Sequence, residues 1–80
     1  MKREEIEEKL TAIFREVFVE PTLVINDSMT ADDVESWDSL SHMLMVTKVE
    51  SDFGVKFKLK DLNKMKNVGD LISLIESKLA

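Results

Sequence analysis

Residues 34 to 43, VESWDSLSHM, contain the side chains best suited to chemistry in this chain. Ser39 follows an aspartate where a helix-period pattern of apolar residues begins. The start of a helix presents unpaired backbone N–H groups and the positive end of the helix dipole, which together favour a bound phosphate. Asp38 is a good N-cap residue, and Trp37 before it is a candidate for the hydrophobic staple. Ser39 therefore either helps to begin a helix or holds a phosphodiester, and the two roles are compatible.

Other kinds of site fit this region poorly. Ser39 and His42 are three residues apart, but no orienting acid, glycine elbow or oxyanion donor accompanies them, as a nucleophilic pair requires. The acidic run that begins at Asp27 has Met29 and Ala31 where a calcium loop needs ligands. With no cysteine and one histidine, the chain lacks the ligands of a typical zinc site. We therefore predict no catalytic residue, no metal site and no enzyme activity.

A helix is predicted on each side of a long loop. The first helix has an apolar stripe of Ile6, Leu10, Ile13, Phe14, Val17 and Phe18. The loop, residues 20 to 37, is expected to be tethered by Leu23, Val24, Ile25, Met29 and Val34. The second helix begins at Ser39 and ends near Gly54. Its predicted stripe is Leu40, Met43, Leu44, Thr47 and Phe53, flanked by Val46 and Val49.

The last third of the chain is predicted to hold a short helix and a terminal helix. Apolar residues alternate with lysines from residue 55 to 59, but no second strand is available for pairing, so we expect an extended link. A short helix near residues 59 to 65 would be anchored by Leu59, Leu62 and Met65. Asn67 is a predicted N-cap for a final helix with an apolar stripe of Val68, Leu71, Ile72, Ile75 and Leu79. The predicted fold class is all-α, a small bundle of three main helices and one short helix.

Length and charge limit the function further. Eighty residues can close a single core, so residues 1–80 are expected to form one domain. Residues 1 to 52 contain thirteen acidic and five basic side chains, whereas residues 53 to 80 contain three and six. The acidic part would repel a phosphate backbone, which argues against a nucleic-acid partner. No apolar run is long enough to cross a membrane and the N-terminus is too acidic for a signal peptide, so we expect a cytoplasmic, monomeric protein.

The chain as a whole resembles the acyl carrier proteins. Asp38-Ser39-Leu40 stands at the head of the second predicted helix, after a long loop, in a short acidic chain without cysteine. The stretch ESDFGVKF leaves that helix, and NVGDLISLIESKL is similar to the closing stretch of the family, with Val68 and Asp70 at matching positions. The resemblance therefore covers essentially the whole chain and implies an acyl-carrier-like bundle.

The resemblance implies that Ser39 receives 4'-phosphopantetheine from coenzyme A through a phosphopantetheinyl transferase. Acyl groups would then be carried as thioesters on the thiol of the arm and presented to the loading and processing enzymes of fatty-acid, polyketide or related specialised biosynthesis. Asp38 and Leu40 complete the attachment motif, with Asp38 orienting it toward the transferase or only capping the helix. Leu40 and Met43 either join the core or, with Met45, form a partner surface.

The motif also departs from the family pattern. Ser36 and Trp37 stand where the family has glycine and an aliphatic residue, and His42 follows the leucine by two positions. Similar Trp-Asp-Ser-Leu forms resemble carriers of specialised pathways, so Trp37 is expected to influence partner choice. His42 is either a half-packed helix residue or a contact to the arm or a partner.

The segment KFKLKDLNKMK is basic where the family usually has acids. Its lysines either cover the core with their stems or face a partly acidic partner surface. The alternative to a modified carrier is a helical interaction module that keeps the fold but leaves Ser39 unmodified.

Overall fold

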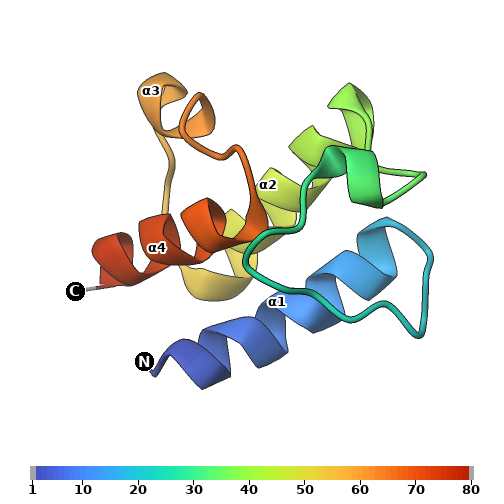
Figure 1. Ribbon diagram of the computed structural model, residues 1–80. Helices are drawn as coiled ribbons and strands as arrows, with labels where there is room; N and C mark the ends of the chain where they lie inside the picture. The colour runs from blue at the N-terminus through green and yellow to red at the C-terminus, as the bar shows by residue number, and fades with distance from the viewer. Residues whose placement is uncertain (1, 80) are drawn as a thin grey trace.

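Four α-helices and one short 3₁₀ turn make up the computed structural model, which describes residues 2–79. The elements are α1 (Arg3–Val17), the turn η1 (Ala31–Asp33), α2 (Ser39–Phe53), α3 (Leu59–Leu62) and α4 (Val68–Leu79). The helix α1 packs against both α2 and α4, and α3 lies apart at one end between two connecting segments (Figure 1). There is no strand within residues 2–79, so the all-α prediction is confirmed. None of these helices is long and apolar enough to cross a membrane.

The first and last helices bury the stripes predicted for them. In α1 the side chains of Ile6, Leu10, Ile13 and Phe14 are buried, and Phe18 just after the helix joins them. In α4 the buried residues are Val68, Leu71, Ile72 and Ile75. Both helices have one apolar face and one polar face, so their periodicity alone indicates which side meets the core.

The stripe predicted for α2 is wrong except at Phe53. Its buried residues are Met45, Val46, Val49 and Phe53, whereas Leu40, Met43 and Leu44 are exposed. This helix is apolar on two sides, and both sets of residues satisfy a spacing of three or four. Packing against α1 determines which side of α2 is buried, because α1 covers only one of the two apolar sides.

The long first connection is held by the first turn of α4. The backbone N–H of Val68 donates to the carbonyl of Met29 at 2.9 Å, and the N–H of Gly69 donates to the carbonyl of Asp27 at 2.9 Å. A Cβ on Gly69 would come within 3.1 Å of that same Asp27 oxygen, so the close approach favours glycine. The loop thereby satisfies N–H groups that a helix start leaves unpaired.

Four of the five predicted loop tethers pack against the core. Met29 and Val34 are buried, and Leu23 and Ile25 pack against the core from partly buried positions. Val24 is 71% exposed, so its prediction as a tether is wrong. Successive side chains of an extended segment point to opposite sides, and Val24 therefore faces away when its two neighbours face inward.

The extended link after α2 is confirmed, and the short helix is shorter than predicted. It ends at Leu62 instead of near residue 65, and Leu59 is 78% exposed where an anchor was expected. Leu62 and Met65 do pack against the core. The buried Asp61 fixes the helix instead, because its carboxylate accepts from the backbone N–H of Lys58 at 2.9 Å and pairs with the ammonium of Lys78 at 3.0 Å.

The carboxyl of Asp61 is consequently held in its charged form. The hydrogen bond from the backbone N–H of Lys58 and the hydrogen bond from Lys78 lower the pKa of Asp61 below its usual value, against a smaller opposing effect of burial. A buried carboxylate with two donors keeps its charge at neutral pH. The α3 segment is therefore tied to α4 by an ion pair in addition to apolar contacts.

The end of α2 gives a first testable prediction. Gly54 has a left-handed backbone, with φ 65° and ψ 36°, and a Cβ added there would meet nothing within 4 Å. The cost of Gly54→Ala is therefore conformational alone. We expect urea denaturation to show a decrease of about 1 kcal/mol in the free energy of unfolding, after allowance for the lower entropy of the unfolded alanine chain.

The matched control is Val19, which follows α1 and has φ 53°. The two helix ends have the same hydrogen bond. The backbone N–H of Glu20 donates to the carbonyl of Arg15 at 3.1 Å after α1, and the N–H of Val55 donates to the carbonyl of Glu50 at 3.1 Å after α2. A left-handed backbone is unfavourable for a β-branched residue. Val19→Gly should therefore increase the free energy of unfolding by roughly several tenths of a kcal/mol. This is the strain that valine has in a left-handed backbone minus the extra entropy that a glycine gives to the unfolded chain. Equal signs for the two changes would contradict this explanation.

Candidate functional site

Ser39 is the first residue of α2, and a hydrogen-bonded cap fixes the backbone around it. Asp38 is the N-cap, as predicted, and its carboxylate accepts from the backbone N–H of Ser41 at 2.9 Å. The hydroxyl of Ser41 accepts from the N–H of Asp38 at 2.8 Å, which completes a reciprocal capping box. Sequence reasoning missed Ser41, although a serine three residues after an aspartate was the signal.

The preceding loop is fastened to the same cap. The hydroxyl of Ser41 donates to the carbonyl of Ser36 at 2.7 Å, and the hydroxyl of Ser36 donates to the carbonyl of Phe18 at 2.9 Å. Ser36 thus joins the start of α2 to the end of α1. A glycine, which the family usually has at this position, has no hydroxyl and cannot make that bond.

The hydroxyl of Ser39 is accessible, and donors lie next to it. Ser39 is exposed, and its side chain makes no hydrogen bond within residues 2–79. Over the same residues the backbone N–H of Ser39 has no hydrogen-bond partner. The N–H groups of Ser41 and His42 donate to Asp38, and the N–H of Leu40 faces its carboxylate closely enough to help lower its pKa. A free donor at the positive end of a helix suits an oxygen of a phosphodiester on Ser39.

The carboxylate of Asp38 remains charged beside this serine. Hydrogen bonds from the backbone N–H and the hydroxyl of Ser41 lower the pKa of Asp38, and a smaller effect of desolvation opposes this. The carboxylate is engaged by the cap, so it is a poor base for the hydroxyl of Ser39. The position of Asp38 therefore suits holding the helix start in place better than taking the proton of Ser39.

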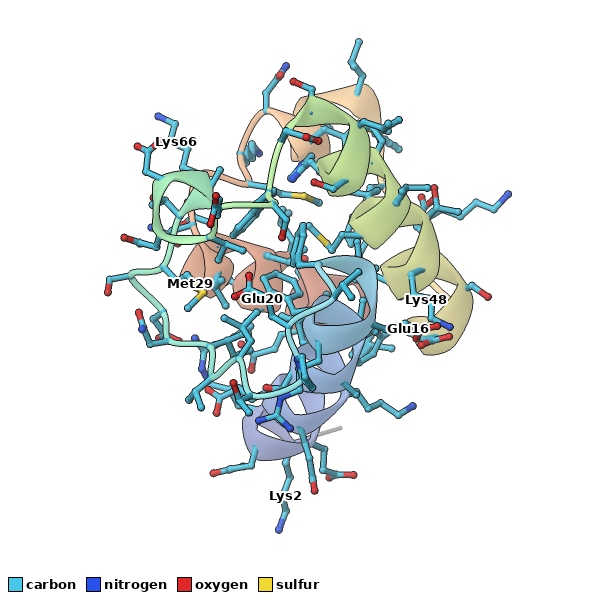
Figure 2. All side chains as sticks on the ribbon, turned by 90° about the vertical axis from the view of Figure 1, so that its right-hand side faces the viewer. Lys2, Glu16, Glu20, Met29, Lys48 and Lys66 are labelled. Carbon is cyan, nitrogen blue, oxygen red and sulfur yellow. The ribbon has the colours of Figure 1, made fainter. Side chains whose placement is uncertain are left out.

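A groove of about 490 Å³ lies beside Ser39. Five of its lining residues come from the motif region that the sequence analysis singled out: Trp37, Asp38, Ser39, His42 and Met43. Three come from elsewhere, Ala31 of η1 and Met65 and Lys66 of the link between α3 and α4. Lys66 lies at the edge of the molecule beside the η1 turn (Figure 2). No local sequence signal joins these three residues to Ser39, because only the fold brings them together.

Trp37 is held between the core and the groove. Its ring lies 5.3 Å from that of Phe14 at an interplanar angle of 77° and 5.4 Å from that of Phe18, and Phe14 and Phe18 meet edge to face at 5.2 Å. Such aromatic contacts add to the burial energy of the rings. The indole N–H then points out of this aromatic cluster of Phe14, Phe18 and Trp37, where it finds a partner on α2.

That partner is His42. The indole Nε1–H of Trp37 donates to Nδ1 of His42 at 3.0 Å. The two rings are 11° from parallel with centroids 6.0 Å apart, an offset arrangement that leaves the indole N–H aimed at the imidazole nitrogen. Trp37 and His42 occupy the two positions of a hydrophobic staple, so the predicted staple is present with a histidine as its second member.

Burial lowers the pKa of His42 below its ordinary value of 6.5. The hydrogen bond acts in the same direction, since protonation would put a proton on the nitrogen that accepts from Trp37. The charged side chains that face the same groove are Asp38 and Lys66. The neutral imidazole is therefore the form that the folded protein favours.

This gives a prediction for the dependence of stability on pH. The unfolded chain binds a proton at His42 more readily than the folded protein does. The contribution of His42 to the free energy of unfolding is therefore complete above pH 6.5 and is lost as the pH falls through the lower pKa of the folded protein. We expect urea denaturation to give a smaller value at about pH 5.5 than at about pH 7.5. His42→Gln, which has no titrating group, should lose less over that interval. Equal losses in the two proteins would contradict the role of His42.

The predicted partner residues divide into accessible and buried ones. Leu40 is 73% exposed and Met43 is 48% exposed, so both are free to meet a partner. Met45 is fully buried in the core, and its prediction as a partner contact is wrong because it lies on the side of α2 that packs inward. Leu44, which the sequence analysis assigned to the core stripe, is exposed beside the other two. The three exposed residues Leu40, Met43 and Leu44 form the apolar face of α2.

Comparison with known proteins gives consistent results. The family described as "Phosphopantetheine attachment site" matches residues 8–75. The acyl carrier protein of Thermotoga maritima is 41% identical over 78 residues, with 96% of this chain and 95% of that protein covered. The acyl carrier protein of Thermosynechococcus vestitus is 32% identical over 81 residues, with 100% of this chain and 99% of that protein covered.

A solved structure is similar over most of the chain. The solution structure of the holo acyl carrier protein from Geobacter metallireducens has a TM-score of 0.87 and 44% sequence identity, and the match covers 91% of this chain and 84% of that one. The similarity thus includes both the order of the helices and the residues along them.

Proposed function

Because the chain belongs to the acyl carrier protein family, we propose that Ser39 is its attachment site for 4'-phosphopantetheine. The protein is a carrier of acyl groups, and phosphopantetheine is the cofactor of its family. The observation that supports the assignment to Ser39 is its exposed position as the first residue of α2, at the positive end of the helix. Asp38 and Leu40 flank it in the sequence of the family motif.

In the proposed reaction the hydroxyl oxygen of Ser39 forms a phosphodiester bond and gives up its proton. The bond that breaks is the pyrophosphate bond of coenzyme A, and adenosine 3',5'-bisphosphate leaves. Asp38 holds the start of α2 in place through Ser41, while the base for the proton comes from the transferase. Once attached, the cofactor supplies a thiol that holds acyl groups as thioesters.

The remaining tasks of this chain are binding and presentation. The N–H of Ser39 and the positive end of α2 offset the charge of the phosphodiester, and Lys66 adds a positive charge to the lining of the groove. The apolar face of α2 lies beside the attachment point and is available to partner enzymes. We propose that the bond-making is done by a phosphopantetheinyl transferase and by acyl-loading and acyl-processing enzymes, with this single-domain monomer acting as their substrate and not as an enzyme.

These partners would belong to fatty-acid, polyketide or related specialised biosynthesis. Trp37 and His42 contribute to partner choice in this proposal through the rigid wall that they form next to Ser39. No nucleic acid is among the proposed partners, because most of the net negative charge of the chain lies before residue 53. The cytoplasmic location expected from the sequence stays a prediction.

The proposal is tested by mass spectrometry of the intact protein. The apo-protein is incubated with coenzyme A and a broad-specificity phosphopantetheinyl transferase, and we expect a mass increase of one phosphopantetheine group. A folded protein of unchanged mass would instead favour the unmodified interaction module. Circular dichroism on the same sample establishes that the helices are intact.

A further inference from the structure

We propose that His42 is a positioning residue for the phosphopantetheine arm: Trp37 holds its imidazole in the tautomer that carries the proton on Nε2, and this N–H donates to an oxygen of the arm. The inference rests on the proposed attachment to Ser39. It concerns where the arm lies on the protein surface, which the attachment itself does not determine.

The tautomer follows from the hydrogen bond to Trp37. An indole nitrogen is only a donor, so Nδ1 of His42 must be the acceptor across the 3.0 Å between them. A neutral imidazole with an unprotonated Nδ1 carries its single proton on Nε2. A charged imidazole would carry protons on both nitrogens and lose the bond, so the bond also favours the neutral ring.

The Nε2–H group of His42 donates no hydrogen bond within the described part of the chain. Within residues 2–79 the structure gives Nε2 no hydrogen-bond partner, and no buried side-chain nitrogen or oxygen over those residues lacks one. Nε2 therefore reaches the solvent of the groove. An arm that lies in the groove would exclude water from this N–H, so the positions of the arm that supply an acceptor to it are favoured over those that do not.

The groove places this donor beside the attachment point. Ser39 and His42 are three residues apart on α2, a spacing that puts two side chains next to each other on one face of a helix. Both line the groove with Met43 and Met65, whose flexible apolar side chains suit the methylene groups of the arm. The arm offers phosphodiester oxygens and amide carbonyls as acceptors, and the aromatic cluster keeps the donor in a fixed place.

A passive role for His42 is the competing explanation. In that case the residue serves only to cap Trp37, and its Nε2–H faces water in both the apo and the modified protein. Two substitutions separate the roles, because the asparagine oxygen matches the place of Nδ1 and the glutamine nitrogen matches the place of Nε2. His42→Asn keeps an acceptor for Trp37 but removes the donor to the arm, whereas His42→Gln keeps a donor and removes the acceptor.

The test uses NMR of the protein before and after modification. Long-range ¹⁵N–¹H spectra of the apo wild type should identify Nε2 as the protonated nitrogen of His42. After the transferase reaction, verified by mass, the Nε2–H signal should shift, and so should either the ³¹P signal or an amide signal of an isotopically labelled arm, depending on which oxygen accepts. The ratio of docked to free arm should fall roughly fivefold in His42→Asn, which is the effect of one ordinary hydrogen bond, and should fall less in His42→Gln.

Several results would overturn the inference. A proton on Nδ1 in the wild type removes its premise, and that measurement does not depend on any variant. Arm signals that are identical in the modified wild type and in modified His42→Asn show that the histidine does not position the arm. A wild type that gains no mass contradicts the proposed function instead, so the two failures are distinguishable.

Discussion

Ser39→Ala is expected to abolish the mass increase on incubation with coenzyme A and a phosphopantetheinyl transferase. The phosphodiester needs the serine oxygen, and alanine offers none. The loss should therefore be complete, to below the detection limit of the mass spectrometer. This is the largest functional effect expected for any single substitution in the chain.

The fold should be almost unaffected by the same change. Ser39 is exposed, its hydroxyl makes no hydrogen bond within the described residues, and the cap of α2 uses Asp38 and Ser41 instead. Surface substitutions of this kind usually change the free energy of unfolding by no more than about 0.5 kcal/mol. A modified fraction of zero with an unchanged urea midpoint would thus indicate lost chemistry and not lost structure.

Ser51→Ala is the matched control. Ser51 is another exposed serine of α2, near the opposite end of the helix. It should gain the full mass of the modified wild type. Modification of Ser39→Ala, or of a second serine in the wild type, would refute the assignment of the site.

Phe14→Ala is expected to have the largest effect on stability. The Phe14 ring is fully buried and contacts both Phe18 and Trp37 edge to face. Removing such a ring typically costs about 3 to 5 kcal/mol, through lost transfer energy and the cavity that remains. A domain of this length has a total stability of roughly 4 to 12 kcal/mol, so the variant should be largely unfolded or close to its midpoint at low urea.

The measurement is equilibrium urea denaturation followed by circular dichroism, with Phe14→Leu as the control. Leucine keeps most of the apolar volume, so its loss should be less than half of that of alanine. Trp37 fluorescence should also change in Phe14→Ala, because the indole loses one wall of the aromatic cluster. A decrease below about 1.5 kcal/mol for alanine would contradict the central packing role of Phe14.

Local patterns in the amino-acid sequence were sufficient to predict several parts of this protein. The stripes of α1 and α4 were readable because each helix is polar on its other side. Asp38 and Asn67 were identifiable as caps, since capping depends on residues three positions apart; the amide oxygen of Asn67 accepts from the backbone N–H of Asp70 at 2.8 Å. The proposed attachment motif is equally local, as a run of three residues at a helix start.

The tertiary structure alone decided which face of α2 is buried and what surrounds Ser39. Two sides of α2 are apolar, and only the packing of α1 selects Met45 for the core and leaves Leu40 exposed. The groove joins His42 to Lys66, 24 positions apart in the chain. Helix periodicity relates residues three or four positions apart, whereas such contacts depend on how whole helices pack, and no local pattern contains that information.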